Sequence, residues 1–571
     1  MPHPQGSKSL GDTLAAILTL EESARSHRIR ALKDADASLG ESLALLQDYA
    51  STGDDFEDAE RADALLDDLE NHQGIKLHGR RSLRAFHLMV DLGVWSRYEN
   101  LWLHRYKVNT SFQPEMLEAA EAIRDARWEP EPWREDLTRL TAFSIDDAWT
   151  SDIDDALSCQ PRIDGGWDVG IHIADPSARI PDGSAIDLEA RARGTSIYLP
   201  TGTIPMLPRA LSEDTLSLNH KAVRPAMSTL VHIDRDLNVV DVRVVPSIIS
   251  VKHRLDYDQV DAILDGDQRS PLEMILQDLS FLASEFFHQR LNDGATDFNI
   301  PDPKIQVSFD GHDQPEISVQ VLDMQSPART LVSEIMILAS SHMARFCYRN
   351  RIPVIYRSQE APDGDLFDNE ILSFPEGLPR TFAMLRRMKS GNITTYPEPH
   401  FGLGVSMYVQ ATSPLRRYSD LICQRQVKAF LADEPLPYDA ETILQIAAMA
   451  ENTSREAGRI ERETRRYWTL YYLATRQGEA LDAMVLDWRD DSTAFVFIEE
   501  VAFRHRCSFR HHVPIGERVR VIIDRSDPRS DQLRLREACG NNTVYSRFVF
   551  GESEGVRITP RRAARSARAP R

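Results

Sequence analysis

The sequence predicts an α+β protein of several domains, with a helical amino-terminal unit, a large mixed domain and a small carboxyl-terminal β-barrel. At 571 residues the chain is longer than one hydrophobic core usually serves. Helix-favouring residues dominate its beginning, whereas strand-like and helix-like patterns alternate through its middle. Near its end only short strand-like segments follow one another, which is typical of a small barrel.

The helical amino-terminal region is expected to cover residues 1–130. Segments such as L-L-Q-D-Y-A and A-D-A-L-L-D-D-L-E favour helices. From Ser82 onward apolar residues recur at helical spacing, and Gly93 suits the end of that helix. The pattern fits a winged-helix or helix-turn-helix unit that contacts nucleic acid. Structural packing accounts for it equally well, so both interpretations stay open.

The large mixed domain is expected over residues 133–476, after a linker that contains Pro130 and Pro132. Within it W-D-V-G-I-H-I-A and S-T-L-V-H-I-D alternate apolar and polar residues, as half-buried strands do. The spacing of apolar residues predicts long helices over residues 329–349 and 441–476.

The carboxyl-terminal barrel is predicted over residues 478–540, where T-A-F-V-F-I and R-V-R-V-I-I-D read as strands of an OB-fold. Residues 541–571 form a basic tail that is predicted to be disordered. From Val501 to Arg571, 16 Arg stand against 7 Asp and Glu, although the net charge of the chain is -21. The carboxyl end is therefore expected to be a basic pole on an acidic protein, suited to binding a nucleic acid.

Composition also bounds the cellular setting. No run approaches the roughly 20 apolar residues of a membrane span, and the start, M-P-H-P-Q-G-S-K, lacks the apolar core of a signal peptide. The five cysteines are far apart without C-x-x-C spacing, which argues against disulfides and zinc. We expect a soluble, cytoplasmic monomer that has no contact with a membrane.

The most informative segment is D-D-A-W-T-S-D-I-D-D, which contains Asp146, Asp147, Asp152, Asp154 and Asp155. Carboxylates this close raise one another's pKa values unless a cation intervenes. Oxygen ligands favour Mg²⁺ or Mn²⁺ over zinc, and such ions can promote phosphodiester hydrolysis. The segment is therefore a candidate metal site.

The alternatives for this acidic segment are a solvated loop and a calcium-binding loop. A solvated loop is the ordinary explanation of a charge run, but Ile145, Ile153, Ala156 and Leu157 interleave with the aspartates and predict burial. A calcium-binding loop would need a D-x-[DN]-x-[DN]-G pattern, which is missing from the sequence here.

At this point S-I-D-D-A-W-T-S-D-I-D-D-A-L-S resembles the opening signature of the RNB catalytic domain of the ribonuclease II/ribonuclease R family. G-I-H-I-A-D-P-S, S-I-Y-L-P-T-G-T, S-E-I-M-I-L-A-S and A-T-S-P-L-R-R-Y-S-D-L-I follow in the family's order. The resemblance covers residues 133–476 and extends to the barrel. It implies a 3′–5′ exoribonuclease that hydrolyses single-stranded RNA to nucleoside 5′-monophosphates in RNA turnover, with Mg²⁺ as cofactor and Mn²⁺ as a substitute.

The resemblance also implies roles for single residues. Asp146, Asp152, Asp154 and Asp155 are expected to hold metal, with Asp154 essential to the chemistry; Asp147 receives no role. Arg416 is expected to neutralise charge on the phosphate, which suits its planar cationic fork. The expected RNA contacts are Tyr198, which stacks on a base, and Tyr257, Glu334, Arg357 and Arg417.

A local pattern places Arg416 more closely. Ser413 and Pro414 read as the N-cap and first residue of a helix, which would put Arg416 in its first turn. The alternative for Arg416 is an exposed ion pair with Asp420, four residues further along the helix.

The chain departs from the family pattern in three places. Residues 1–130 show no cold-shock-type barrels, Ser358 stands where the family often has histidine, and a family glutamate aligns with neither Glu461 nor Glu463.

Two rival functions stay open. One is a non-catalytic RNA-binding regulator, and the other is a nuclease that acts on single-stranded DNA.

Overall fold

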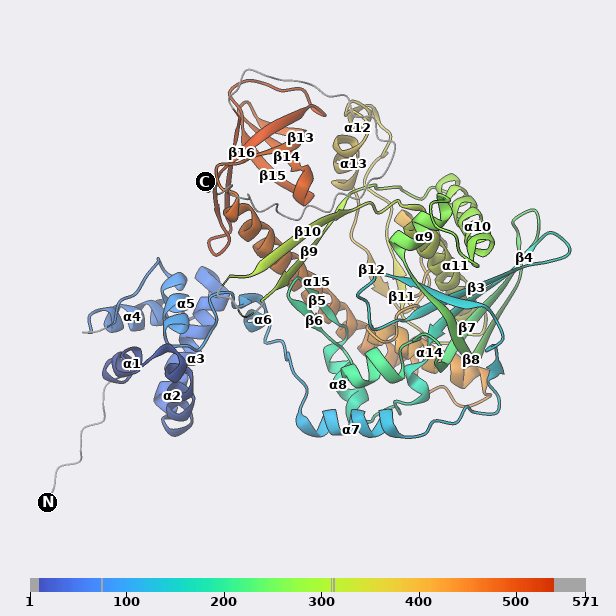
Figure 1. Cartoon of the computed structure of the whole chain (residues 1–571), viewed down its shortest axis with the longest axis horizontal. Helices are drawn as coiled ribbons and strands as arrows, with labels where there is room; N and C mark the ends of the chain where they lie inside the picture. Colours follow the sequence, from blue (N-terminus) through green and yellow to red (C-terminus); the bar gives the residue numbers. More distant parts are fainter. Residues whose placement is uncertain (1–9, 73–74, 310, 312–313, 539–571) are drawn as a thin grey trace, which may run out of the picture. The chain divides into compact units, whose positions relative to one another are not determined.

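The computed structural model describes residues 10–72, 75–309, 311 and 314–538. It divides into two compact units, which Figure 1 colours along the sequence. The first unit joins residues 1–115 to residues 454–464, and the second joins residues 116–453 to residues 465–571. The predicted tail at 541–571 lies outside the described residues.

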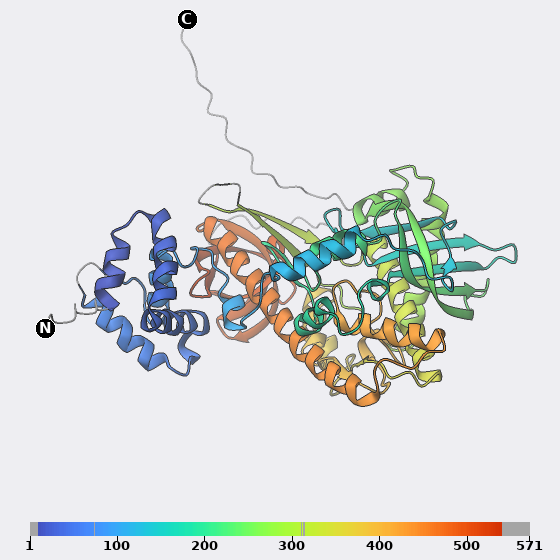
Figure 2. The same cartoon turned by 90° about the horizontal axis from the view of Figure 1, so that it is seen from below.

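The first unit is built from helices, as Figure 2 shows in blue. They are α1 (Leu10–Leu18), α2 (Glu22–Ala35), α3 (Ala37–Thr52), α4 (Ala59–Glu70), α5 (Ser82–Asp91) and α6 (Leu101–Arg105). The helix predicted from Ser82 is present, and Gly93 follows it with φ +71°. No strand occurs among the described residues of this unit, which fits a helix-turn-helix unit and not a winged helix.

The second unit contains a six-stranded sheet in the order β1-β8-β2-β3-β4-β7. The long strand β8 pairs with β7 through Val239–Ser250 and then with β2 from Val251 onward, so the sheet curls back on itself. The strands are β1 (Glu135–Asp136), β2 (Ala142–Asp146), β3 (Asp155–Pro161), β4 (Trp167–Ala174), β7 (Val223–Ile233) and β8 (Val239–Asp256).

Helices pack against both faces of this sheet (Figure 1). One apolar core joins the sheet to α9 (Tyr257–Leu264), α10 (Glu273–Asn292) and α11 (Pro327–Arg349). A second core joins it to α8 (Ala185–Arg193), α14 (Tyr418–Leu431) and α15 (Ala440–Thr475). The two long predicted helices are therefore confirmed as α11 and α15.

Short elements connect these layers. They are α7 (Pro114–Asp125), α12 (Asn369–Leu372), α13 (Leu378–Leu385), the hairpins β5 (Ile197–Leu199) with β6 (Gly202–Ile204) and β9 (Asp302–Ser308) with β10 (Glu316–Leu322), and the pair β11 (Tyr356–Ser358) with β12 (Asn392–Thr394). Within the described parts of the chain, no helix is long and apolar enough to cross a membrane.

The second unit ends in a closed barrel with the strand order β13-β14-β15-β17-β16, which confirms the predicted OB-type barrel. Its strands are β13 (Ala480–Asp490), β14 (Thr493–Ile498), β15 (Phe503–Ser508), β16 (Arg518–Asp527) and β17 (Gln532–Glu537). Alternate residues fill the interior, among them Val485, Val496 and Val521, each fully buried. The four described cysteines are buried free thiols.

Candidate active site

The acidic segment connects two strands of the sheet, because β2 ends on Asp146 and β3 begins on Asp155. Ile145 and Leu157 are buried in the core on one face of the sheet. Ile153 and Ala156 are buried in the core on the other face. The interleaved apolar residues thus fix the loop from both sides, and the solvated-loop interpretation is wrong.

Backbone contacts fix the same loop. The hydroxyl of Ser217 accepts a hydrogen bond from the Ile153 amide at 2.9 Å and donates one to the Ser151 carbonyl at 2.9 Å. The Leu218 amide donates to the Ile153 carbonyl at 3.0 Å. The loop's buried polar groups therefore have partners, as a defined loop conformation requires.

Asp154 is the most deeply buried of the four aspartates predicted to hold metal, with 3% of its surface exposed. The Leu415 amide donates to one carboxylate oxygen at 2.8 Å, and Nε of Arg416 lies 3.3 Å from the other. Burial raises the pKa of Asp154 well above its usual range, although Arg416 and the Leu415 amide oppose this. Asp152 and Asp155 add to the rise through their own charges.

Two neighbouring carboxyl groups are perturbed in the same direction. Burial, with the charge of Asp146, raises the pKa of Asp155 to about 7. Burial also raises the pKa of Asp146, although it accepts hydrogen bonds from the Asp147 amide at 2.8 Å and the Thr150 hydroxyl at 2.9 Å. Arg416 is the cation that opposes the rise at all three groups. The site is therefore short of positive charge.

This donor set fits a hard cation by its chemistry, because its ligands would all be carboxylate oxygens. Among the described residues, however, no three Asp, Glu, His or Cys side chains lie close enough together to hold a metal ion. A bound ion would therefore have to draw the carboxylates inward.

The prediction that Ser413 caps a helix was wrong. Helix α14 begins only at Tyr418, and residues 413–416 form a turn before it. The reason is Asp420, which is fully buried and accepts hydrogen bonds from the Ser413 amide at 2.8 Å and from Arg417 at 2.7 Å. Asp420 is thus paired with Arg417, and Arg416 is left to contact Asp154.

Two predicted aromatic contacts lie beside the carboxylates. Tyr198, on β5, is 38% exposed and donates a hydrogen bond to Asp152 at 3.0 Å. The guanidinium carbon of Arg416 lies 5.9 Å from its ring centroid. Tyr257 begins α9, and burial together with the charges of Asp146 and Asp155 raises its pKa. Both rings therefore belong to the same site as the aspartates.

Two other predicted RNA contacts, Arg357 and Glu334, make hydrogen bonds to other side chains of the protein. Arg357 donates to the Gln410 side chain at 3.0 Å, and burial lowers its pKa. Glu334 is 3% exposed, and both its oxygens accept hydrogen bonds from Arg290.

The two glutamates at 461 and 463 lie in the part of α15 that belongs to the first unit, so the choice between them stays open.

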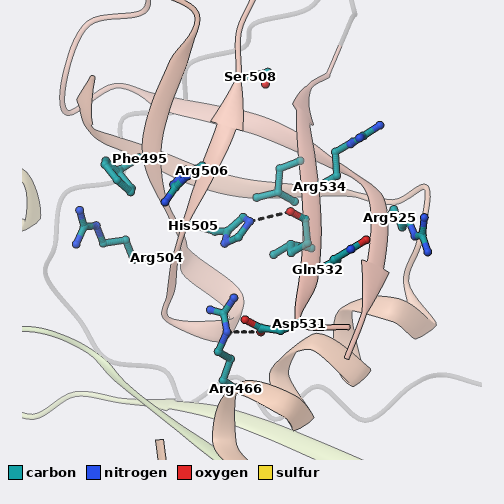
Figure 3. Close-up of a pocket in the computed structure, with 12 residues that line it drawn as sticks. Arg466, Phe495, Arg504, His505, Arg506, Ser508, Arg525, Asp531, Gln532 and Arg534 are labelled. Atoms are coloured by element: carbon teal, nitrogen blue, oxygen red, sulfur yellow. Dashed lines mark hydrogen bonds and ion pairs between the residues drawn. The ribbon is translucent and has the colours of Figure 1, made fainter. Parts of the chain in front are cut away.

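A basic pocket of about 740 Å³ lies on the barrel (Figure 3). Its arginines are Arg466 from α15, Arg504 and Arg506 from β15, Arg525 from β16 and Arg534 from β17. Asp531 is the one carboxylate among its lining residues and pairs with Arg466 at 2.5 Å. The Arg504 guanidinium carbon lies 4.2 Å from the centroid of the Phe495 ring. Stacked cations and a ring suit an extended nucleic acid.

Sequence reasoning missed a group next to the aspartate loop. Lys304 and Arg329 both donate to Asp147, at 3.0 Å and 3.2 Å. The tryptophan within the acidic run, Trp149, was the available signal, because a large aromatic residue there is unexpected. The partners lie more than 150 residues away along the chain, and only the fold brings them together.

Residues 134–433 match the RNB domain. The chain belongs to the RNB family. Residues 12–101 match a double HTH domain, which confirms the helix-turn-helix interpretation of the first unit.

Two curated relatives are named as ribonucleases. An uncharacterized ribonuclease of Synechocystis is 36% identical and covers 80% of this chain and 67% of its own. Ribonuclease II of Arabidopsis thaliana, chloroplastic/mitochondrial, is 31% identical and covers 80% of this chain. This chain spans only 57% of the Arabidopsis protein.

Solved structures share the fold. An active-site mutant of the Dss1 exoribonuclease from Candida glabrata has a TM-score of 0.73 at 23% identity and covers 92% of this chain and 70% of its own. RNase R of Mycoplasma genitalium, in complex with single-stranded RNA, has a TM-score of 0.67 at 22% identity and covers 77% of both chains. Yeast Ssd1, a pseudonuclease, has a TM-score of 0.54 at 19% identity and covers 70% of this chain and 51% of its own.

Proposed function

We propose that the chain is a 3′–5′ exoribonuclease that hydrolyses single-stranded RNA to nucleoside 5′-monophosphates in RNA turnover. The observation that carries the proposal is the environment of Asp154. This carboxylate is buried between a backbone amide and Arg416, within a group of carboxyl groups whose pKa values are raised. Such perturbed, clustered groups are typical of catalytic sites.

We propose Mg²⁺ as the cofactor, with Mn²⁺ able to substitute, held by Asp146, Asp152, Asp154 and Asp155. When bound, such an ion supplies charge stabilisation and an activated water for attack at phosphorus. Arg416, whose guanidinium lies against Asp154, would face the phosphate and neutralise the charge that develops on it.

Substrate binding is assigned to exposed and basic groups. Tyr198 would stack on a base near the scissile bond, Tyr257 would contact RNA beside it, and Arg357 would contact the backbone. Arg417 and Glu334 are engaged in ion pairs with Asp420 and Arg290, so within this proposal they hold their neighbours in place. The basic barrel pocket would bind RNA further from the 3′ end.

The test is digestion of a 5′-labelled single-stranded RNA with Mg²⁺ by the full chain and by Asp154→Asn. We expect a ladder that shortens from the 3′ end with the parent chain and an intact substrate with the variant. Asp241→Asn, at an exposed position on β8, is the matched control and should digest like the parent. A DNA of equal sequence distinguishes a nuclease for single-stranded DNA.

The rival with a specific observation in its favour is the non-catalytic regulator, because the pseudonuclease Ssd1 shares the fold. Intact RNA in every lane, together with RNA binding by the parent chain, would support that rival. Cytoplasmic location and a monomeric state stay predictions from the sequence.

A further inference from the structure

A group of side chains adjoins the aspartate loop and has no role in the function proposed above. Asp147 and Trp149 lie on the loop, Lys304 lies on β9, and Arg329 lies near the start of α11. The Asp147 carboxylate accepts hydrogen bonds from Lys304 at 3.0 Å and from Arg329 at 3.2 Å. The side chains of both cations are 16% exposed, so they are held in place rather than free in solvent.

Each of these two cations also covers an aromatic ring. The Lys304 ammonium lies against the face of Trp149, and the Arg329 guanidinium carbon lies 4.2 Å from the Tyr257 ring centroid. Asp147, to which both cations donate, directly follows Asp146 on the loop. The group therefore extends from the carboxylates to Trp149 without a break.

Trp149 is 50% exposed although Lys304 covers one face of its ring. Because half of the side chain is exposed, the part of the ring that Lys304 does not cover can receive a ligand. Exposure alone decides nothing, because Trp133 is 49% exposed and also lies against an arginine, Arg134. Trp149 differs from Trp133 in its position, since it is three residues from Asp146 on the loop that carries the site.

The charge of the group indicates what that ligand is. Lys304 and Arg329 share the Asp147 carboxylate, and the Lys304 ammonium lies against the Trp149 ring, so a cation and a partly exposed aromatic ring stand side by side on this loop. A base attached to a phosphate matches this combination, because the base stacks on the ring and the phosphate attracts the cation.

We propose that Trp149 and Lys304 form a nucleotide-binding subsite for single-stranded RNA, next to the candidate active site. The exposed part of the Trp149 ring stacks on one base, Lys304 contacts the phosphate attached to that nucleotide, and Asp147 holds Lys304 in position. Because every base has a π face, the subsite binds all four bases. The inference rests on the proposed function only in taking RNA as the ligand.

The test uses the full chain with Asp154→Asn, so that the RNA survives. Single-stranded RNAs with one 5-iodouridine at successive distances from the 3′ end are bound and irradiated, and crosslinked residues are identified by mass spectrometry. We expect one position near the 3′ end to crosslink to Trp149. We also expect Trp149→Ala to weaken RNA binding by roughly 5- to 100-fold, whereas Trp149→Phe retains most of the affinity.

Two further variants control the interpretation. Trp133→Ala, at the equally exposed tryptophan, should leave the affinity unchanged. Lys304→Gln should reduce the slope of log affinity against log salt by about 0.7, the value for one phosphate contact on a single strand. Circular dichroism melting of each variant shows whether it is folded.

The outcomes separate this inference from the proposed function. RNA binding by the parent with no crosslink to Trp149, or with Trp149→Ala at parental affinity, overturns the subsite alone. The subsite stands if the crosslink forms in a chain that never degrades RNA, and then only the exonuclease activity fails. No RNA binding by the parent chain overturns both.

Discussion

Adjacent arginines in one turn have different environments. Arg416 contacts Asp154 at 3.3 Å, and its side chain is 43% exposed. Arg417 pairs with Asp420, which is completely buried, at 2.7 Å. The Arg416 guanidinium is therefore directed to the candidate active site. The Arg417 guanidinium neutralises the buried charge of Asp420 and so contributes to stability.

We expect opposite consequences from removing these two arginines. Arg416→Ala should lower kcat roughly 10²- to 10³-fold, the typical effect of losing one group that stabilises transition-state charge. It should lower the free energy of unfolding less than Arg417→Ala does, because the Arg416 side chain is 43% exposed. Arg417→Ala should lower the free energy of unfolding by about 3 kcal/mol, because it leaves Asp420 buried without its partner. Single-turnover RNA hydrolysis and urea unfolding measure the two quantities. Equal losses of stability in both variants would contradict this assignment.

At the scale of elements, the strand–loop–strand segment of β2 and β3 positions the aspartates. Its loop is anchored in both apolar cores, through Ile145 and Leu157 on one side and Ile153 and Ala156 on the other. Ile153 is 1% exposed and stands directly between Asp152 and Asp154. Packing of this side chain therefore helps to hold the backbone from which both carboxylates project.

Shortening Ile153 should consequently affect both stability and catalysis. We expect Ile153→Ala to lower the free energy of unfolding by about 2–5 kcal/mol and Ile153→Val by about 0.5–1.5 kcal/mol. Activity should fall in the same order at a temperature at which both variants are folded. Ile163→Ala, at a fully exposed isoleucine in the turn after β3, is the control and should change neither. Parental activity in folded Ile153→Ala would show that the loop does not depend on this contact.

Across the whole molecule the charge is distributed unevenly. The chain carries a net charge of -21, yet the barrel pocket is lined by five arginines and one carboxylate. Binding of a polyanion to such a surface releases counterions from the nucleic acid and depends strongly on salt. The barrel can thus attract RNA in spite of the acidic total charge.

Replacing Arg504 and Arg506 together by Gln should weaken RNA binding at low salt. Each lost phosphate contact should reduce the slope of log affinity against log salt by about 0.7. Arg520→Gln, on β16 outside the pocket, serves as the control within the same barrel. Fluorescence anisotropy with labelled single-stranded RNA over a salt series measures the slopes. An unchanged slope in the double variant would place RNA binding elsewhere.

The classes of element and the burial of an acidic segment could be predicted from local sequence patterns. Periodicity predicted α11, α15 and the barrel strands, because these segments bury one regular face and local pattern follows burial. The run of aspartates and its interleaved apolar residues likewise predicted a buried acidic site, since both signals lie within ten residues of one another. The start of α14 was misplaced, because a buried aspartate overrode a local capping signal.

The groups that reach the site from distant parts of the sequence could be identified from the tertiary structure alone. Leu415 reaches Asp154 across 261 residues of sequence, its neighbour Arg416 contacts the same carboxylate, and Lys304 reaches Asp147 across 157. Such contacts depend on how the sheet curls and how α11 and α14 pack against it, which no local pattern records. The pairing of Glu334 with Arg290, 44 residues apart, was hidden from the sequence for the same physical reason.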